Sequence, residues 1–291
     1  MRSVLIILLT LIIVSCSGSK KVVENTTQAS TQTKAPEVTD TDSKTEETEQ
    51  TTSENSIENN TSEEEEEEPI VEHETTFELF DHSAYNTLLE KYVSNEGNVD
   101  YKGIKSEINV LKSYLASLSE NMPDDTWTKE DKLAYWINAY NAMTIDLILR
   151  HYPIKSIKDI DKPWKQRYWK LGEKWYNLDE IEHQIIRKMG EPRIHFALVC
   201  AAVSCPKLYN KAFYATSLED DLTLLTKAFL NDTSKNSISE NDLRLSKIFS
   251  WFAKDFKQNG SLIDFLNQYT EITISDKAKK RFNDYNWELN E

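Results

Sequence analysis

The chain has 291 residues and a formal net charge of −15. This acidity excludes general nucleic-acid binding, which depends on clustered Lys and Arg side chains. The sequence has no glycine-rich phosphate loop, nucleophile elbow or paired-cysteine metal motif, and its five histidines are scattered. We therefore expect no cofactor and no metal.

The N-terminus has the layout of a bacterial export signal. Arg2 precedes an apolar run of roughly ten residues, which is too short to cross a bilayer permanently. The sequence Ile-Val-Ser-Cys at 13–16 resembles a lipobox, in which the cysteine is acylated after cleavage. We expect a signal peptide at 1–15 and a palmitate-bearing Cys16 that anchors the protein in the cell envelope, on the outer membrane. The alternative is an ordinary signal peptide cut near Ser15 or Gly18.

The composition changes abruptly after the export signal. Residues 16–76 contain no Phe, Tyr or Trp and hold most of the net negative charge, including six consecutive glutamates. Such a segment buries too little apolar surface to offset the entropy lost on ordering. We predict a disordered acidic linker there, followed by one globular domain at 77–291, which carries every aromatic residue of the chain.

Helices are predicted first in this domain. Apolar residues recur at helical spacing in Ser83–Val93 and in Ile104–Leu118. A longer helix is expected at Lys129–Tyr152, because Thr128 and Asp131 form a capping-box pattern ahead of an apolar face.

A hairpin, a helix and a buried strand are expected next. The hairpin pairs Arg167–Leu171 with Lys174–Leu178 across a Gly-Glu turn. Asp179 is placed to cap a helix that runs through Lys188. The apolar, β-branched run Ile194–Val203 predicts a buried strand.

The C-terminal third is predicted to hold short helices, a second hairpin and a last strand. The helices are Leu218–Leu230, Ile248–Phe256, Leu262–Tyr269 and Asp276–Asn283, the hairpin pairs Asn236–Ser239 with Leu243–Ser246, and the strand is Tyr285–Leu289. Because helices outnumber strands and do not alternate regularly with them, we expect an α+β domain.

Two asparagines stand out on the predicted long helix. Asn138 and Asn141 are three residues apart and share one face. Asparagine is unfavourable inside a helix, so the pair calls for an explanation. Either the two amides satisfy loop backbone groups inside the fold, or they line a polar pocket.

The next predicted helix carries a row of ionisable residues. Asp179, His183 and Arg187 are spaced four apart and therefore share a face. Glu182 would point about 100° away from His183, so we expect these two neighbours not to pair. Histidine suits proton transfer near neutral pH, but a buried structural histidine fits the pattern equally well.

Cys200 and Cys205 could form a disulfide in an oxidising envelope. In a straight strand, residues five apart are separated by roughly 16 Å, whereas a bridge requires Cα atoms within roughly 7 Å. We therefore predict two free thiols; only a tight turn at Ala202–Ser204 would allow closure. Cys205, at the predicted strand end before a proline, is the better candidate nucleophile.

Three linked motifs resemble the family catalogued as domain of unknown function 547. They are Leu133–Ala142 (LAYWINAYNA), Leu178–Arg187 (LDEIEHQIIR) and Ile194–Pro206 (IHFALVCAAVSCP). Asn98–Tyr101 and Leu245–Trp251 also fit the pattern, so the resemblance covers roughly residues 80–270. It implies a known domain type and no particular reaction.

Together these features predict a thiol-dependent enzyme that hydrolyses, or transfers an acyl group from, an amide or ester. Cys205 would be the nucleophile and His183 its base, with Asn138 or Asn141 binding the oxyanion. The further pocket or substrate-binding residues would be Glu182, Arg187, His195 and Ser204.

The alternative is a non-catalytic lipoprotein that binds a cell-wall glycan, a peptide or a protein. Trp164, Trp169 and Trp175 are candidates for stacking on sugar rings, although most aromatic side chains serve core packing. A close approach of His183 to Cys205 beside an open cleft would favour the enzyme.

Overall fold

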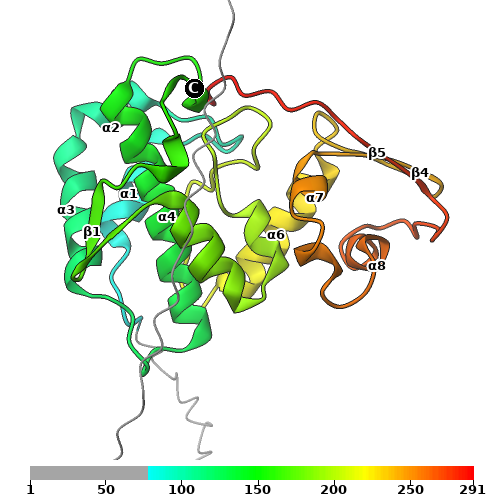
Figure 1. Cartoon of the computed structure of the whole chain (residues 1–291), viewed down its shortest axis with the longest axis horizontal. Coiled ribbons are helices and arrows are strands. Elements are labelled where there is room, and N and C mark those ends of the chain that lie inside the picture. Colours follow the sequence, from blue (N-terminus) through cyan, green and yellow to red (C-terminus); the bar gives the residue numbers. More distant parts are fainter. Residues whose placement is uncertain (1–77) are drawn as a thin grey trace, which may run out of the picture. The chain divides into compact units, whose positions relative to one another are not determined.

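A computed structural model describes residues 78–291 (Figure 1). The predicted signal peptide, Cys16 and acidic linker lie outside the described residues. The described part belongs to one compact unit, in which helices dominate and two small sheets are present. The predicted α+β class is confirmed. No helix among residues 78–291 is both long and apolar enough to cross a membrane.

The helices of the described part are short, apart from the long α4. They are α1 (Ser83–Tyr92), α2 (Tyr101–Ser106), α3 (Ile108–Glu120), α4 (Lys129–His151), α5 (Leu178–Glu180), α6 (Leu218–Asn231), α7 (Ile248–Trp251) and α8 (Leu262–Asn267). Single 3₁₀ turns occur at Ile157–Asp159, Pro163–Lys165, Ile186–Met189, Pro192–Phe196 and Asp255–Lys257, and a π-helical turn at Ile181–Ile185.

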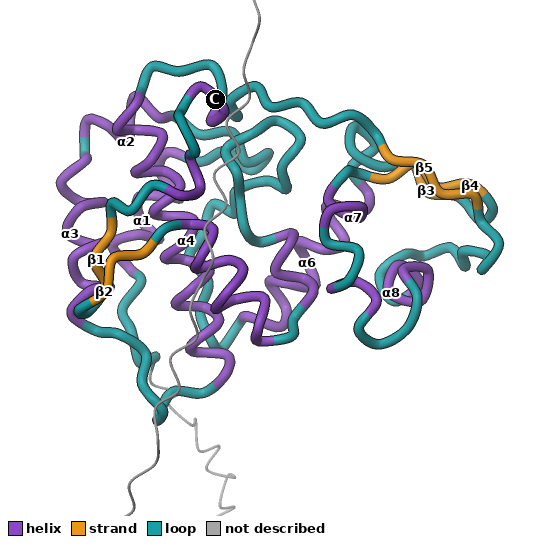
Figure 2. Tube along the Cα trace, viewed as in Figure 1, coloured by secondary structure: helices purple, strands orange, loops and turns teal. Residues whose placement is uncertain are grey.

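The strands form two separate sheets, which lie apart in Figure 2. They are β1 (Trp169–Leu171), β2 (Lys174–Tyr176), β3 (Ser237–Ile238), β4 (Asp242–Leu245) and β5 (Lys279–Phe282). The hairpin β1–β2 and the antiparallel pair β3–β4 confirm the two predicted hairpins.

Helix α4 is the centre of the core. The predicted capping box forms at its start: the Asp131 N–H donates to Thr128 Oγ1 (3.1 Å), and the Thr128 N–H donates to Asp131 Oδ2 (3.2 Å). Every residue from Leu133 to Leu149 is buried. The helix is therefore enclosed on all sides, whereas its sequence predicted a single apolar face.

A buried carboxylate fixes the first hairpin against α4. Asp146 Oδ2 accepts a hydrogen bond from Trp169 Nε1 (2.8 Å) in β1 and another from Arg150 Nε (2.7 Å). A buried carboxylate is tolerated where hydrogen-bond donors compensate its charge, and Trp169 and Arg150 supply these donors to Asp146. The hairpin in turn covers one end of the core.

Two predicted helices differ from the structure in their detail. The segment predicted as one helix at Ile104–Leu118 is two, α2 and α3, which are separated at Glu107. The helix predicted from Asp179 begins two residues earlier, because the Asn177 side chain accepts from the Glu180 N–H (2.8 Å). The helical turns end at Gly190, which takes the left-handed conformation (φ 71°).

The helix predicted at Asp276–Asn283 is wrong. This segment contains β5, which pairs in parallel with β4, so that Asp242 lies opposite Lys279 and Leu245 opposite Phe282. The edge of β4 offers this segment backbone hydrogen bonds that no local sequence pattern shows.

The strand predicted at Ile194–Val203 is also wrong. The chain forms a 3₁₀ turn at Pro192–Phe196 and then runs irregularly, with Ala201 in the left-handed conformation (φ 53°). A tight turn follows, in which the Cys205 N–H donates to the Ala202 carbonyl (2.9 Å). The predicted last strand is reduced to one bridge between Leu289 and Ala202. The helix predicted at 248–256 is only α7 and a later 3₁₀ turn.

Candidate functional site

The asparagines of α4 serve the fold. Asn138 donates to the Phe213 carbonyl (2.7 Å) and accepts from the Phe213 N–H (2.9 Å). Asn141 donates to the Ala197 carbonyl (2.9 Å) and accepts from the Val199 N–H (3.1 Å). Both side chains are buried, and their amides are occupied by loop backbone. The structural interpretation of this pair is confirmed, and neither amide is free to bind an oxyanion.

An open cavity of about 610 Å³ lies beside α4 and the irregular segment that follows Phe196. Its volume is within the range of small-molecule sites. Its walls combine ionisable side chains, aromatic rings and two cysteines. The lining includes Tyr140, Lys162, Trp164, Lys165, Asp179, Glu182, His183, Arg187, His195, Cys200, Cys205, Trp251, Phe252, Tyr285 and Trp287.

The predicted row of ionisable residues forms the first wall. His183 Nε2 lies 3.7 Å from Asp179 Oδ1, and His183 Nδ1 accepts from Arg187 Nη1 (3.1 Å). This row is confirmed. Glu182 Oε1 lies 3.7 Å from His183 Nδ1, closer than its predicted direction implies, but that nitrogen accepts from Arg187 and forms no hydrogen bond with the Glu182 carboxylate. The wider π-helical turn reduces the angle between neighbouring side chains.

Asp255 is the centre of this network, and sequence reasoning missed it. Its carboxylate accepts from Arg187 Nε (2.6 Å) and Nη2 (2.8 Å), and from His195 Nε2 (2.8 Å). Burial favours the neutral acid, but the hydrogen bonds from His195 and Arg187 outweigh it and hold the pKa of Asp255 well below its usual range. Asp255 therefore stays ionised at neutral pH.

His195 is positioned by this carboxylate rather than exposed for proton transfer. His195 is 4% exposed, and its ring stacks on Phe252, with ring centroids 3.9 Å apart. Burial lowers the pKa of His195, and the bond to Asp255 opposes that shift only in part. The ring is neutral at pH 7, with Nε2–H directed at Asp255.

The second wall is aromatic. Ring centroids are 4.8 Å apart for Trp251 and Tyr285, 4.6 Å for Tyr285 and Trp287, and 5.8 Å for Trp164 and Trp287. Trp251 is 47% exposed, which leaves much of its indole ring available to a ligand. Across the cavity, the Tyr140 hydroxyl donates to Glu182 Oε2 (3.1 Å).

Of the predicted stacking tryptophans, only Trp164 lines the cavity. Trp169 is buried against Asp146, and Trp175 is 52% exposed on β2, outside the cavity lining. Trp251 and Trp287 were not predicted. Trp251 lies in a quoted motif, 245–251, but nothing in its spacing distinguished it from a core residue.

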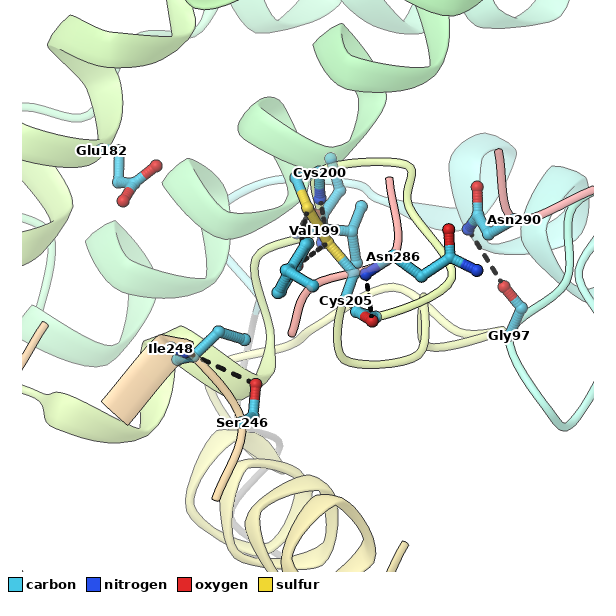
Figure 3. The surroundings of a disulfide bond; sticks show 12 residues. Gly97, Glu182, Val199, Cys200, Cys205, Ser246, Ile248, Asn286 and Asn290 are labelled. Carbon is cyan, nitrogen blue, oxygen red and sulfur yellow. Dashed lines mark hydrogen bonds between the residues drawn. A yellow bond between two sulfur atoms is a disulfide. The ribbon is translucent and has the colours of Figure 1, made fainter. Parts of the chain in front are cut away.

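Cys200 and Cys205 form a disulfide with Cα atoms 6.1 Å apart (Figure 3). The prediction of free thiols is wrong. It assumed a straight strand, whereas the chain makes a tight turn that ends at Cys205 and brings the two cysteines together. His183 and Cys205 line the same cavity, but neither Asn138 nor Asn141 lines it, and no hydrogen bond joins His183 to Cys205 in the described structure. With its sulfur bonded to Cys200, Cys205 is not a nucleophile in this state.

The remaining predicted residue, Ser204, supports this turn. Its Oγ accepts from the Asn286 N–H (2.8 Å), and its own N–H donates to the Asn286 carbonyl (3.1 Å). Ser204 does not line the cavity. Within residues 78–291, no group of three or more His, Cys, Asp or Glu side chains is placed to hold a metal ion.

Residues 125–230 match the family model described as "Protein of unknown function, DUF547". The predicted resemblance is confirmed. The matched segment is shorter than the expected 80–270 and includes both cysteines and His183, whereas Asp255 and the aromatic residues Trp251, Tyr285 and Trp287 follow it. Searches of curated proteins and of solved structures found no match. The matched segment thus supplies the ionisable wall of the cavity and Trp164, and the C-terminal residues supply the rest of the aromatic wall.

Proposed function

We propose that this domain binds a glycan in the aromatic-walled cavity, as the ligand-binding part of an envelope lipoprotein. The observation that carries the proposal is the cluster of Trp164, Trp251, Tyr285 and Trp287 along one wall of an open cavity of about 610 Å³. Exposed indole faces stack on the apolar faces of sugar rings.

The opposite wall supplies groups suited to sugar hydroxyls. Asp179 and Glu182 offer carboxylate acceptors, while Lys162 and Lys165 offer ammonium donors at the same cavity. A site with one apolar wall and a few polar groups binds a ligand that has both kinds of surface. A sugar ring has that composition.

Binding is favoured over thiol catalysis because the predicted nucleophile and the predicted oxyanion-binding amides already bond to other groups of the protein. Cys205 is bonded to Cys200, and the amides of Asn138 and Asn141 hold loop backbone. Nucleophilic catalysis requires a free thiolate and a base within hydrogen-bond reach.

A thiol hydrolase or acyltransferase is the second candidate, restricted to a reduced form. The observation in its favour is that His183 and Cys205 line one open cavity. A thiol-reactive acyl probe would label the reduced chain, and Cys205→Ser would abolish the labelling. If the reduced chain and Cys205→Ser label equally, this candidate is wrong.

The glycan proposal is tested by titration with cell-wall oligosaccharides, followed by tryptophan fluorescence. We expect Trp251→Ala and Trp287→Ala to weaken binding at least about tenfold, because truncating a buried aromatic contact removes roughly 1.4 kcal/mol or more. Trp175→Ala is the matched control, since Trp175 is about as exposed as Trp251 but lies outside the cavity lining. Equal affinity in all three variants, or binding of peptides in place of oligosaccharides, would contradict the proposal.

A further inference from the structure

The disulfide lies in an unusual place for a structural crosslink. Both Cys200 and Cys205 line the open cavity, and they are only five residues apart in sequence. A bridge that closes so short a loop restrains the unfolded chain least, so its contribution to stability is small. A disulfide accessible to solutes is, in addition, open to attack by thiolates.

The two sulfurs differ in environment. Cys205 is 3% exposed, whereas Cys200 is partly exposed. A thiolate that enters the cavity therefore reaches Cys200 more readily than Cys205. Attack at Cys200 makes Cys205 the leaving group.

Donors are already in place for a Cys205 thiolate. The Cys200 N–H donates to Cys205 Sγ (2.8 Å), and the Tyr285 hydroxyl is within reach of both sulfurs, 3.1 Å from Cys200 Sγ and 3.3 Å from Cys205 Sγ (Figure 3 shows the first of these contacts). Once Cys200 Sγ has been attacked, this hydroxyl can donate to the charge that develops on Cys205 Sγ. Burial raises the pKa of Tyr285, so its hydroxyl stays protonated and remains a donor. Hydrogen bonds to a sulfur anion lower its basicity and make it a better leaving group.

The turn that joins the cysteines does not depend on the disulfide. The Val203 N–H donates to the Glu288 carbonyl (2.8 Å), Ser204 bonds to Asn286, and the Cys205 N–H bonds to Ala202. These contacts stay when the S–S bond opens. The two thiols of the reduced form are therefore held close together and ready to close again.

From these observations we propose that Cys200–Cys205 is a thiol–disulfide exchange site that oxidises a dithiol. A substrate thiolate attacks Cys200 Sγ, the Cys200–Cys205 bond breaks, and Cys205 leaves as a thiolate. The second substrate thiolate then attacks the mixed disulfide and expels Cys200. Two electrons pass to the protein, the two substrate protons end on the two cysteines, and the substrate becomes a disulfide. Exchange with another disulfide, by the reverse steps, restores the starting state.

The first test uses the folded full-length chain in a Cys16→Ser background, which leaves only Cys200 and Cys205. Dithiothreitol and a reduced two-cysteine peptide serve as the small and the polypeptide dithiol. Maleimide labelling read by intact mass should show both cysteines reduced without denaturant, and the peptide should gain a disulfide in equal amount. If either probe reduces the disulfide only after the chain is unfolded, the disulfide is a structural crosslink and the proposal is wrong.

Variants test the assigned order of events. Tyr285→Phe should slow reduction by dithiothreitol at least about fivefold, because the leaving sulfur loses a donor. Tyr168→Phe, whose ring contacts Arg150 and Trp169, is the matched control and should react at the unchanged rate. Equal rates for the two variants would contradict the role of Tyr285.

Single-cysteine variants test which sulfur is attacked. Cys205→Ser leaves the partly exposed Cys200, which should react with an aromatic disulfide reagent at least about tenfold faster than Cys205 does in Cys200→Ser. The reverse order would contradict attack at Cys200. The assays contain no glycan, so their failure would leave the proposed binding function untouched.

Discussion

At the residue scale, Asp255 shows how one unpredicted side chain organises several predicted ones. Its carboxylate is 13% exposed and joins Arg187 to the buried His195. Asp255→Asn would leave the Arg187 guanidinium without its anion and would weaken the acceptor for the buried His195 Nε2–H. We expect a loss of about 2–3 kcal/mol in the free energy of unfolding, measured with urea.

A surface ion pair provides the control for that loss. Asp242 bonds to Arg281 (2.6 Å), but both side chains are about half exposed. Asp242→Asn should therefore change the free energy of unfolding by less than about 0.5–1 kcal/mol. If Asp255→Asn lowers the free energy of unfolding as little as Asp242→Asn does, the Asp255 network does not stabilise the fold.

His82 should make stability depend on pH. Its ring is buried and Nδ1 lies 2.7 Å from the Tyr114 hydroxyl, and burial lowers its pKa from 6.5 to about 4. Between these values the unfolded chain binds more protons than the folded one, so stability falls as the pH falls from 6.5 towards 4. The loss from this group is about 3 kcal/mol. His82→Gln should remove that slope in urea unfolding; an unchanged slope would contradict the assignment.

At the element scale, the asparagines of α4 tie this helix to two different loops. Asn138→Ala and Asn141→Ala each leave a buried backbone N–H and carbonyl unpaired, so each should cost about 2–4 kcal/mol of unfolding free energy. Only Asn141 bonds to the segment that leads into Cys200. We therefore expect Asn141→Ala alone to change the reduction rate of the disulfide, with Asn138→Ala as its control.

The elements also show what sequence can and cannot predict. Helix α4 and the β1–β2 hairpin follow from local patterns, the capping box and the turn, and both were predicted. The segment 194–203 and strand β5 depend on partners distant in sequence, namely Asn141 and the edge of β4. Local periodicity carries no information on such partners, so both were predicted wrongly, and the disulfide with them.

Local sequence patterns likewise predicted only some of the residues that line the candidate site. Asp179, His183 and Arg187 lie on consecutive helical turns, and their spacing predicted their proximity. Asp255 comes from a 3₁₀ turn about seventy residues later, and Tyr285 and Trp287 from an irregular C-terminal segment. Only the folded backbone brings these residues to the cavity, and no local motif marks them.

At the scale of the whole molecule, the cavity draws its lining from residues far apart in sequence, from Tyr140 in α4 to Trp287 near the C-terminus. Its first wall lies in residues 125–230, which match the family model, and Trp251, Tyr285 and Trp287 come after residue 230. The C-terminal segment also holds the cysteine turn through Asn286 and Glu288. A ligand at the aromatic wall would therefore lie in the same cavity as the disulfide, so the proposed glycan binding and the proposed thiol–disulfide exchange share one cavity.

We expect the position of this cavity in the cell to depend on Cys16, which lies outside the described residues. Arg2, the short apolar run and the lipobox-like residues 13–16 predict acylation of this cysteine. Each buried methylene of an acyl chain contributes about 0.8 kcal/mol to membrane binding, and two or more chains make the anchor stable. Cys16→Ala should therefore move the protein from the outer-membrane fraction to the soluble fraction after a salt wash. Thr27→Ala, which leaves the lipobox intact, is the control and should stay with the membrane; a Cys16→Ala variant that also stays there would exclude lipid anchoring at this residue.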